Sequence, residues 1–231
     1  MKKGIDAPFV PVLFIVAGVL GIIPAYNSHN PYNLIFPVIM ITMAVLFIHT
    51  SLFGKYRIIH QVVSSLNIPK DSKVLDLGTG HGAVLLEVAK KLKSPGKVIG
   101  IDIWQSADQS SNSQSATQHN IKQADVEEVA KIQTANMTSL PFTDNEFDYV
   151  FASFAIHNVK PKKQRELAIS EALRVLKDNG QLIIIDMEHI GEFKRYLIEH
   201  ECIVNVHRTG INGIWGWIPT SVINAKSTQP K

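Results

Sequence analysis

Charged side chains are missing from a long stretch near the start of the sequence. Between Ala7 and Gly54 there is no Asp, Glu, Lys or Arg, although the 231 residues include 23 basic and 20 acidic ones. Such a stretch does not make an ordinary soluble surface, because charged residues are the ones a protein mostly exposes to water. The chain therefore joins an uncharged N-terminal part to a remainder with the composition of a globular protein.

Cysteine is almost absent as well. Cys202 is single, so an internal disulfide is excluded, and no cysteine spacing suggests a zinc site. We expect no metal site. The net charge of +3 is small and the lysines are scattered along the chain. The sequence thus lacks the basic footprint of a nucleic-acid-binding protein, and we expect no nucleic-acid partner.

The uncharged part consists of two apolar segments separated by a short polar turn. Residues 8–26 and 33–53 are each about twenty residues long, enough to cross the ~30 Å hydrocarbon core of a bilayer. The turn, NSHNPYN, contains Pro31, which breaks a helix. A cleaved signal peptide would have one apolar region, and core helices would normally carry a polar stripe. The sequence favours a transmembrane helical hairpin over residues 1–54.

Basic residues flank both ends of this hairpin. Lys2 and Lys3 precede the first segment, Lys55 and Arg57 follow the second, and the connecting turn has no Lys or Arg. The positive-inside rule places both ends in the cytoplasm. We therefore expect a cell-membrane protein with two spans, the lipid bilayer as a partner and a cytoplasmic catalytic domain. Residues 55–72 have apolar positions at helical spacing and are predicted to form a linker helix.

Short β-branched runs alternate with helical stretches from residue 73 onward. This alternation predicts an α/β domain with a doubly wound parallel sheet over residues 73–231. The expected strands are 73–77, 97–102, 129–134, 147–153, 181–186, 202–207 and 220–225, and the expected helices are 81–92, 115–123, 162–176 and 192–199. No crossover helix fits between the last two strands, so the seventh should enter antiparallel. Gly180 should end the third helix in a left-handed conformation.

The first predicted strand runs into a glycine-rich turn. The segment VLDLGTGHG, residues 74–82, places three glycines between strand and helix, where glycine allows a positive φ and lets a ligand approach the backbone. Asp102 ends the next strand and suits a ribose. Both features fit either a nicotinamide dinucleotide or S-adenosylmethionine. Asp76, two residues before the first glycine, favours S-adenosylmethionine, because a carboxylate would repel a pyrophosphate and attract a cationic amino acid.

Two further segments resemble class I S-adenosylmethionine-dependent methyltransferases. They are TANMTSLPFTDNEFDYV, residues 134–150, and EALRVLKDNGQLIIID, residues 171–186. Within this family the chain is similar to a bacterial group with DIW at the second strand, an apolar N-terminal anchor and no assigned substrate. The resemblance covers roughly residues 62–225. It implies a Rossmann-like doubly wound fold with seven strands, a methyl-transfer reaction and S-adenosyl-L-methionine as the cofactor.

The resemblance also implies which residues bind the methyl donor. They are Asp76, Gly78, Thr79, Gly80, Asp102, Ile103, Trp104, Asn136, Met137 and Ser153. Asp76 would orient the ammonium group of the donor, and the glycine-rich turn would pass beneath its methionine portion. Asp102 would accept hydrogen bonds from both ribose hydroxyls, which the two oxygens of a carboxylate suit.

The adenine of the donor would be held by residues from two strand ends. Ile103 and Trp104 would flank the ring, and Met137 would pack on it. Asn136 stands where many relatives have Asp, and would accept a hydrogen bond from the adenine amino group. Compared with an Asp carboxylate, the Asn136 amide keeps an acceptor oxygen but carries no charge.

The exit of the fourth strand lies beside the transferable methyl group in this family. His157 and Asn158, in the segment FASFAIHNV, are therefore the candidate catalytic residues. His157 could act as a general base for an acceptor that keeps its proton near neutrality. Packing beneath the donor or capping the loop is an equally open role. Residues 106–118, rich in Ser and Gln, are expected to be a loop with a role at the same edge.

The predicted anchor and the absence of a separate cap domain suggest where the acceptor comes from. We expect methyl transfer to a small, lipophilic or membrane-proximal acceptor. The alternatives are a catalytically silent donor-binding module that regulates a membrane partner, and an NAD-dependent oxidoreductase. Trp215 and Trp217 are expected either at the bilayer surface, which indoles favour, or in the core.

Overall fold

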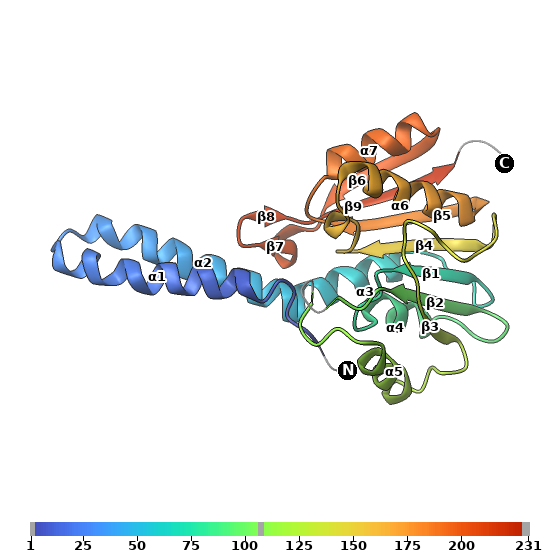
Figure 1. Cartoon of the computed structure of the whole chain (residues 1–231), viewed down its shortest axis with the longest axis horizontal. Coiled ribbons are helices and arrows are strands. Elements are labelled where there is room, and N and C mark those ends of the chain that lie inside the picture. Colours follow the sequence, from blue (N-terminus) through green and yellow to red (C-terminus); the bar gives the residue numbers. More distant parts are fainter. Residues whose placement is uncertain (1–2, 106–108, 228–231) are drawn as a thin grey trace.

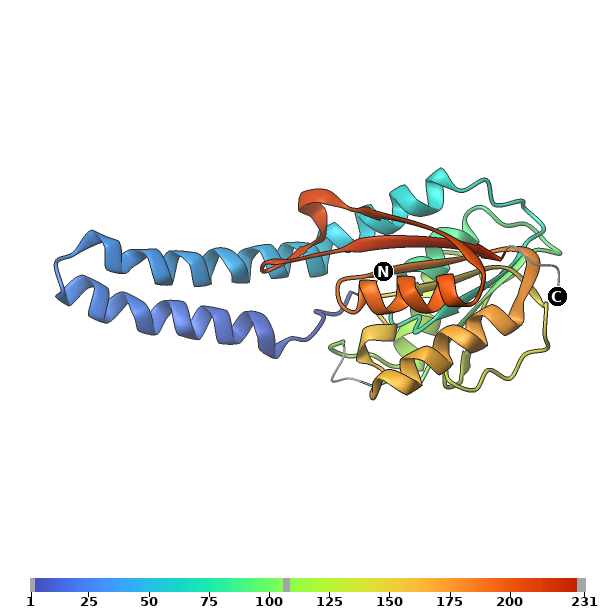
Figure 2. The same ribbon diagram turned by 90° about the horizontal axis from the view of Figure 1, so that it is seen from above.

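The chain folds into an elongated helical hairpin joined end-on to an α/β domain (Figure 1). The computed structural model describes residues 3–105 and 109–227. The carboxyl ends of the parallel strands point toward the hairpin, and the loops at these ends meet its base (Figures 1 and 2). Segments from both halves of the molecule therefore come together at one edge of the sheet.

The hairpin consists of two antiparallel helices. Helix α1 spans Phe9–Asn27 and α2 spans Ile35–His49, with a short 3-10 helix η1, Pro31–Leu34, between them. Apolar side chains cover both helices, and most of them face away from the protein. By length and composition both segments could cross a membrane.

The second apolar segment continues without a break into the helix that precedes the sheet. A π-helical turn η2, Thr50–Gly54, joins α2 to α3, Lys55–Ser65. Helix α3 packs on the sheet domain through Ile58, Ile59 and Val63, which are buried in one of its two apolar cores. The predicted linker helix is therefore present and continues from α2, but it ends at Ser65, so residues 66–72 of the predicted linker are not helical.

A seven-stranded sheet forms the centre of the globular part. Its order is β3-β2-β1-β4-β5-β9-β6. The strands are β1 Lys73–Leu77, β2 Lys97–Asp102, β3 Ala130–Thr134, β4 Phe147–Ser153, β5 Leu176–Asp186, β6 Cys202–Arg208 and β9 Ser221–Ser227. The first five strands are parallel, and β9 lies antiparallel between β5 and β6. The predicted doubly wound sheet with an antiparallel last strand is confirmed.

Helices cover both faces of the sheet (Figure 2). They are α4 Ala83–Ala89, α5 Gln114–Gln123, α6 Lys162–Val175 and α7 Ile190–Glu199. Apolar side chains of α3, α4 and α5 form one core with one face of the sheet, and those of α6 and α7 form a second core with the other face. The strand order reverses between β1 and β4, which is where ligands bind in sheets of this kind.

The end of α6 differs from the prediction. The helix stops at Val175 and β5 begins at once at Leu176. Gly180 does not end the helix; it lies within β5, where a Cβ would meet the Leu176 side chain at 2.6 Å. The pairing with β4 shifts register between Phe147 and Tyr149, so the residues before Gln181 bulge from the ladder. Packing against β4 thus overrides the local helix-ending signal.

The connection between β6 and β9 forms a small hairpin that reaches the helices. After the 3-10 helix η4, Gly210–Gly213, the strands β7, Ile214–Trp215, and β8, Ile218–Pro219, pair with each other. The Trp215 ring packs edge-on against Phe47 of α2 at a centroid distance of 5.1 Å. Trp215 is 2% exposed and belongs to the core, whereas Trp217 is 60% exposed.

Candidate functional site

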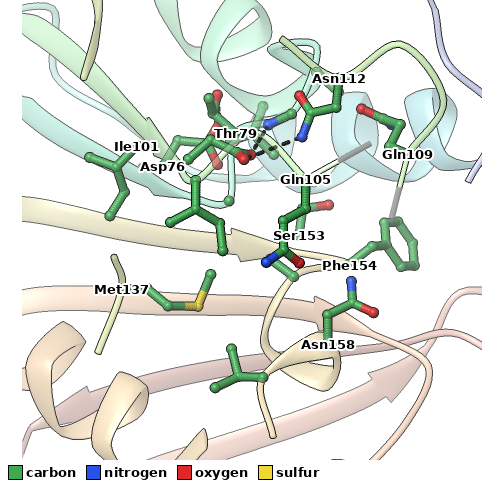
Figure 3. A pocket seen from close by; sticks show the side chains of 18 of the residues that line it. Asp76, Thr79, Ile101, Gln105, Gln109, Asn112, Met137, Ser153, Phe154 and Asn158 are labelled. Atoms are coloured by element: carbon green, nitrogen blue, oxygen red, sulfur yellow. Dashed lines mark hydrogen bonds between the residues drawn. The ribbon is translucent and has the colours of Figure 1, made fainter. Parts of the chain in front are cut away.

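A cavity of about 410 Å³ opens at the carboxyl ends of β1, β2 and β4 (Figure 3). Its wall includes most of the residues predicted to bind the methyl donor, and one of the two candidate catalytic residues. These are Asp76, Gly78, Thr79, Gly80, Asp102, Ile103, Asn136, Met137, Ser153 and Asn158. Chain segments as far apart in sequence as Asp76 and Asn158 thus meet around one space, at the point where the strand order reverses.

The glycine-rich turn forms one wall of the cavity. Gly78 and Gly80 adopt φ values of 66° and 51°, which L-residues with a side chain rarely adopt. A Cβ on Gly78 would also lie 2.5 Å from the Cβ of Ala155. The turn therefore requires glycine at this position, and its bare backbone faces the space that a ligand would fill.

Asp102 ties the end of β2 to the glycine-rich turn. Its Oδ2 accepts a hydrogen bond from the backbone N–H of Gly80 at 2.8 Å. Its Oδ1 accepts from the backbone N–H of Trp104 at 2.6 Å and from the side-chain amide of Asn112 at 3.2 Å. The carboxylate is 9% exposed, and its charge lies at the cavity wall.

Asp76 is almost completely buried beneath the turn, with 1% exposure. Its Oδ2 accepts hydrogen bonds from the Thr79 hydroxyl at 2.6 Å and from the backbone N–H of Leu85 at 3.2 Å. Burial raises the pKa of this carboxyl to about 7, against the opposing effect of the two hydrogen bonds. A cation entering the cavity would favour the ionised carboxylate.

The remaining wall contains a polar atom without a protein partner. The Ser153 hydroxyl at the end of β4 is buried and makes no hydrogen bond to any described residue. Buried polar groups are normally paired, so this hydroxyl is suited to a ligand. Asn136 uses its Oδ1 locally, because that oxygen accepts from the N–H and the hydroxyl of Thr138 at 3.0 and 2.9 Å.

Two predicted site residues do not line the cavity. The Trp104 indole donates to the hydroxyl of Thr134 on the neighbouring strand β3, at 2.8 Å. The imidazole Nδ1 of His157 lies 2.7 Å from Oδ1 of Asp186, a fully buried residue at the end of β5. His157 and Asn158 are neighbours in η3, Ile156–Asn158, but only Asn158 reaches the cavity wall. The geometry supports the structural role of His157, which is to hold η3 against β5.

The structure adds residues to the site that the sequence pattern does not indicate, namely Asp6, Lys55 and Tyr56. It also brings in Gln109, from the loop expected at this edge. Asp6 accepts hydrogen bonds from Lys55 at 2.6 Å, from Ser51 at 2.8 Å and from the Gln109 amide at 2.8 Å. Asp6, Ser51, Lys55 and Gln109 are called the Asp6 cluster below. Asp6 is the only acidic residue before Asp71, and this isolation is the one feature of the sequence that marks it as unusual.

The Asp6 cluster also reaches the glycine-rich turn. The Gln109 side-chain oxygen accepts from the backbone N–H of His81 at 3.2 Å. Ser110 and Ile5 exchange two hydrogen bonds, with the Ser110 N–H donating at 3.0 Å and its hydroxyl accepting at 2.8 Å. The segment that precedes α1 therefore closes one side of the cavity. Residues 106–108 of the predicted loop lie outside the described residues.

Two sequence segments that resembled one family are held to each other. Arg174 of α6 donates to the carbonyl oxygens of Leu140 and Phe142 at 3.1 and 2.9 Å. Glu171 pairs with Arg174 and accepts from the Leu140 N–H at 2.7 Å. The Arg174 guanidinium lowers the pKa of Glu171. This network fixes the loop after β3, which carries Asn136 and Met137.

Comparison with known proteins gives a match over the same region. Residues 75–184 match a family model described as a methyltransferase domain. The demethylmenaquinone methyltransferase of Lactiplantibacillus plantarum is 32% identical over 126 residues, which cover 54% of this chain and 49% of that protein. The ubiquinone/menaquinone biosynthesis C-methyltransferase of Rickettsia typhi is 32% identical over 132 residues, covering 55% and 49%. The chain thus spans about half the length of the curated relatives it matches.

The fold also has solved counterparts. The crystal structure of a SAM-dependent methyltransferase from Aquifex aeolicus superposes with a TM-score of 0.56 at 20% identity, covering 72% of this chain and 88% of that one. At this identity the likeness concerns the fold. It agrees with the seven-stranded sheet described above.

Proposed function

We propose that the chain is a membrane-anchored methyltransferase that uses S-adenosyl-L-methionine and methylates a small lipophilic acceptor. The match of residues 75–184 to the methyltransferase-domain model and the similarity to named methyltransferases support this proposal. The hairpin of residues 1–54 would be its two-span anchor, residues 55–72 its linker and residues 73–231 its cytoplasmic catalytic domain. One observation carries the proposal: residues from both ends of the apolar hairpin help to form the wall of the cavity.

The residues at the cavity fit S-adenosylmethionine. The glycine-rich turn presents bare backbone, Asp102 offers a carboxylate for the ribose, and the unpartnered Ser153 hydroxyl offers a hydrogen bond. Asp76 provides a buried carboxyl that a cationic amino acid would ionise. The same charge would repel a pyrophosphate, which argues against a nicotinamide dinucleotide.

The cofactor supplies a methyl group already activated by a sulfonium. The chain then has to bind the acceptor, align it with the methyl carbon and exclude water. Asn158 and the Tyr56 hydroxyl are suited to orient an acceptor, because both line the cavity and the buried Tyr56 hydroxyl has no hydrogen-bond partner among the described residues. The pair of His157 and Asp186 would position Asn158 through η3.

The physical class of the acceptor follows from the anchor and from the relatives. The Asp6 cluster joins the hairpin ends to the cavity, so an acceptor dissolved in the bilayer would find the site at the membrane surface. The named relatives act on demethylmenaquinone or in ubiquinone and menaquinone biosynthesis. We infer that the acceptor of this chain is likewise a small molecule that partitions into lipid.

Transfer of labelled methyl groups tests the proposal. The protein in lipid nanodiscs would be incubated with methyl-labelled S-adenosylmethionine and, separately, with the lipid, aqueous-metabolite and protein fractions of its host. We expect label in a small molecule of the lipid fraction, and none with Asp102→Ala. Label confined to water-soluble metabolites or proteins would contradict the lipophilic acceptor. Donor binding without transfer into any fraction would instead indicate a regulatory module.

Donor affinity is expected to depend on pH through Asp76. Its pKa of about 7 means that the carboxyl is increasingly protonated below neutrality, whereas the cationic donor favours the ionised form. The affinity for S-adenosylmethionine should therefore fall about tenfold per pH unit below pH ~7 and level off above it. Calorimetry from about pH 5 to 8 measures this. Asp76→Asn should bind more weakly and show a flat profile; a flat profile in the wild type would contradict the role of Asp76.

A further inference from the structure

The connection between β6 and β9 has the composition of a membrane-contacting segment. Between Arg208 and Lys226 the sequence contains no charged residue, and it includes two of the three tryptophans. Trp217 is 60% exposed and Ile211 is 70% exposed, although both are large and apolar. The β7–β8 hairpin, residues 214–219, lies beside the base of the helical hairpin (Figures 1 and 2).

The contacts of this β-hairpin place it alongside both apolar helices. The Trp217 ring lies 5.5 Å from that of Phe14 in α1. A Cβ on Gly216 would lie 3.3 Å from the Phe14 ring and 3.8 Å from the Cβ of Met43 in α2. Behind the exposed tip, Trp215 packs between Phe47 and Phe154, at 5.1 Å from each. The tip therefore sits at the level of Phe14 and Met43.

The Asp6 cluster marks the polar boundary of the same helices. Its member Ser51 lies eight residues beyond Met43 along one continuous helix, a distance of ~12 Å at 1.5 Å per residue. If the apolar helices are in a bilayer, the charged cluster lies in or near the headgroups. The tip of the β-hairpin then lies ~12 Å deeper. One headgroup layer is only about 5–7 Å thick, so the tip reaches the outer part of the hydrocarbon, next to the interface where tryptophan is enriched.

We propose that the β7–β8 hairpin inserts into the cytoplasmic face of the lipid bilayer as a third membrane element. In this arrangement the Trp217 side chain contacts lipid. This inference rests on the membrane anchoring proposed above. The backbone of the insertion is largely paired, as membrane depth requires. Strands β7 and β8 pair with each other, the Ile214 carbonyl accepts from the Thr50 hydroxyl at 2.6 Å, and the Thr220 N–H donates to Gly213 at 2.7 Å.

The insertion would fix how the catalytic domain faces the membrane. Two helices alone would let the domain tilt about their ends, whereas a third contact defines a plane. Phe154 lines the cavity and packs on Trp215, so the inserted hairpin is continuous with the cavity wall. The carboxyl edge of the sheet is thereby held against the bilayer, and a lipophilic acceptor can reach the cavity without crossing water.

Tryptophan quenching by brominated lipids tests the insertion. The full-length protein would be reconstituted into phosphatidylcholine vesicles brominated either near the headgroup or near the chain ends, without donor or acceptor. We expect strong quenching by the shallow bromines, lost for the most part in Trp217→Phe. Trp104→Phe is the matched control. Trp104 lies on the sheet domain, where its indole donates to Thr134 of β3, so it should not contact lipid. Removing its unquenched emission should therefore raise the fraction of the total tryptophan fluorescence that bromines quench.

Three outcomes would contradict the proposals at different levels. If Trp217→Phe unfolds at the wild-type temperature and is quenched as strongly as the wild type, the β-hairpin does not carry the lipid contact. If the wild type floats with vesicles but is not quenched, the anchor is correct and the insertion is wrong. Failure to float with vesicles at all would refute the membrane anchor itself. None of these readings depends on methyl transfer.

Discussion

Asp102→Ala is expected to lower the affinity for S-adenosylmethionine by at least about a hundredfold. Hydrogen bonds to a charged group contribute about 1.5–3 kcal/mol each, and two ribose hydroxyls would lose theirs. The substitution also removes the acceptor for the Gly80 N–H and for Asn112, so the glycine-rich turn loses its tie to β2. Isothermal calorimetry with the purified variant measures the effect.

Asp148→Ala is the matched control for this measurement. Asp148 also accepts a backbone N–H, that of Lys73 at 2.8 Å, and also pairs with another side chain, that of Lys177. It lies near the start of β4, at the edge of the sheet away from the cavity. We expect its donor affinity to match the wild type. Wild-type affinity in Asp102→Ala would show that the donor site is assigned wrongly.

Gly54→Ala is expected to destabilise the junction between the helices and the sheet domain. A Cβ on Gly54 would lie 1.9 Å from the backbone oxygen of Asn212 in η4. A backbone carbonyl cannot swing aside as a flexible side chain can, so the helix and η4 must move apart. Overpacking of this kind costs about 1–3 kcal/mol. The midpoint of thermal unfolding in detergent should fall by roughly 2–12 °C.

Gly191→Ala makes the same chemical change where space is available. Gly191 lies in α7, and a Cβ there would meet nothing within 4 Å. Because alanine favours a helix over glycine, this variant should be as stable as the wild type or slightly more so. An unchanged unfolding midpoint in Gly54→Ala would mean that the helices do not pack on η4 as described.

Local patterns were sufficient for most of the architecture. The expected strands appear within one or two residues of their predicted bounds, except that β5 begins five residues early at Leu176. The alternation of β-branched runs with amphipathic stretches is a local property, and the antiparallel last strand followed from a connection too short for a crossover helix. Gly180 differs from the local expectation of a helix end because its conformation depends on the pairing of β5 with β4.

The candidate site was partly visible in the sequence. Asp76, Asp102 and the glycines stand next to strand ends, and strand ends of a parallel sheet meet at one edge, so their convergence could be predicted. Whether a side chain at that edge turns into the cavity depends on its neighbours. The sequence pattern places His157 and Trp104 at the site, but contacts with Asp186 and Thr134 hold their side chains away from the cavity.

The sequence by itself determined that an uncharged apolar hairpin precedes a doubly wound domain with a glycine-rich turn, because charge, periodicity and turn chemistry are written in consecutive residues. Only the tertiary structure decided that these two parts share one cavity. Asp6 meets Gln109 across more than a hundred residues, and Trp217 lies against Phe14 across two hundred. Such contacts depend on how the helices dock on the sheet, which is set by shape and packing over many residues at once.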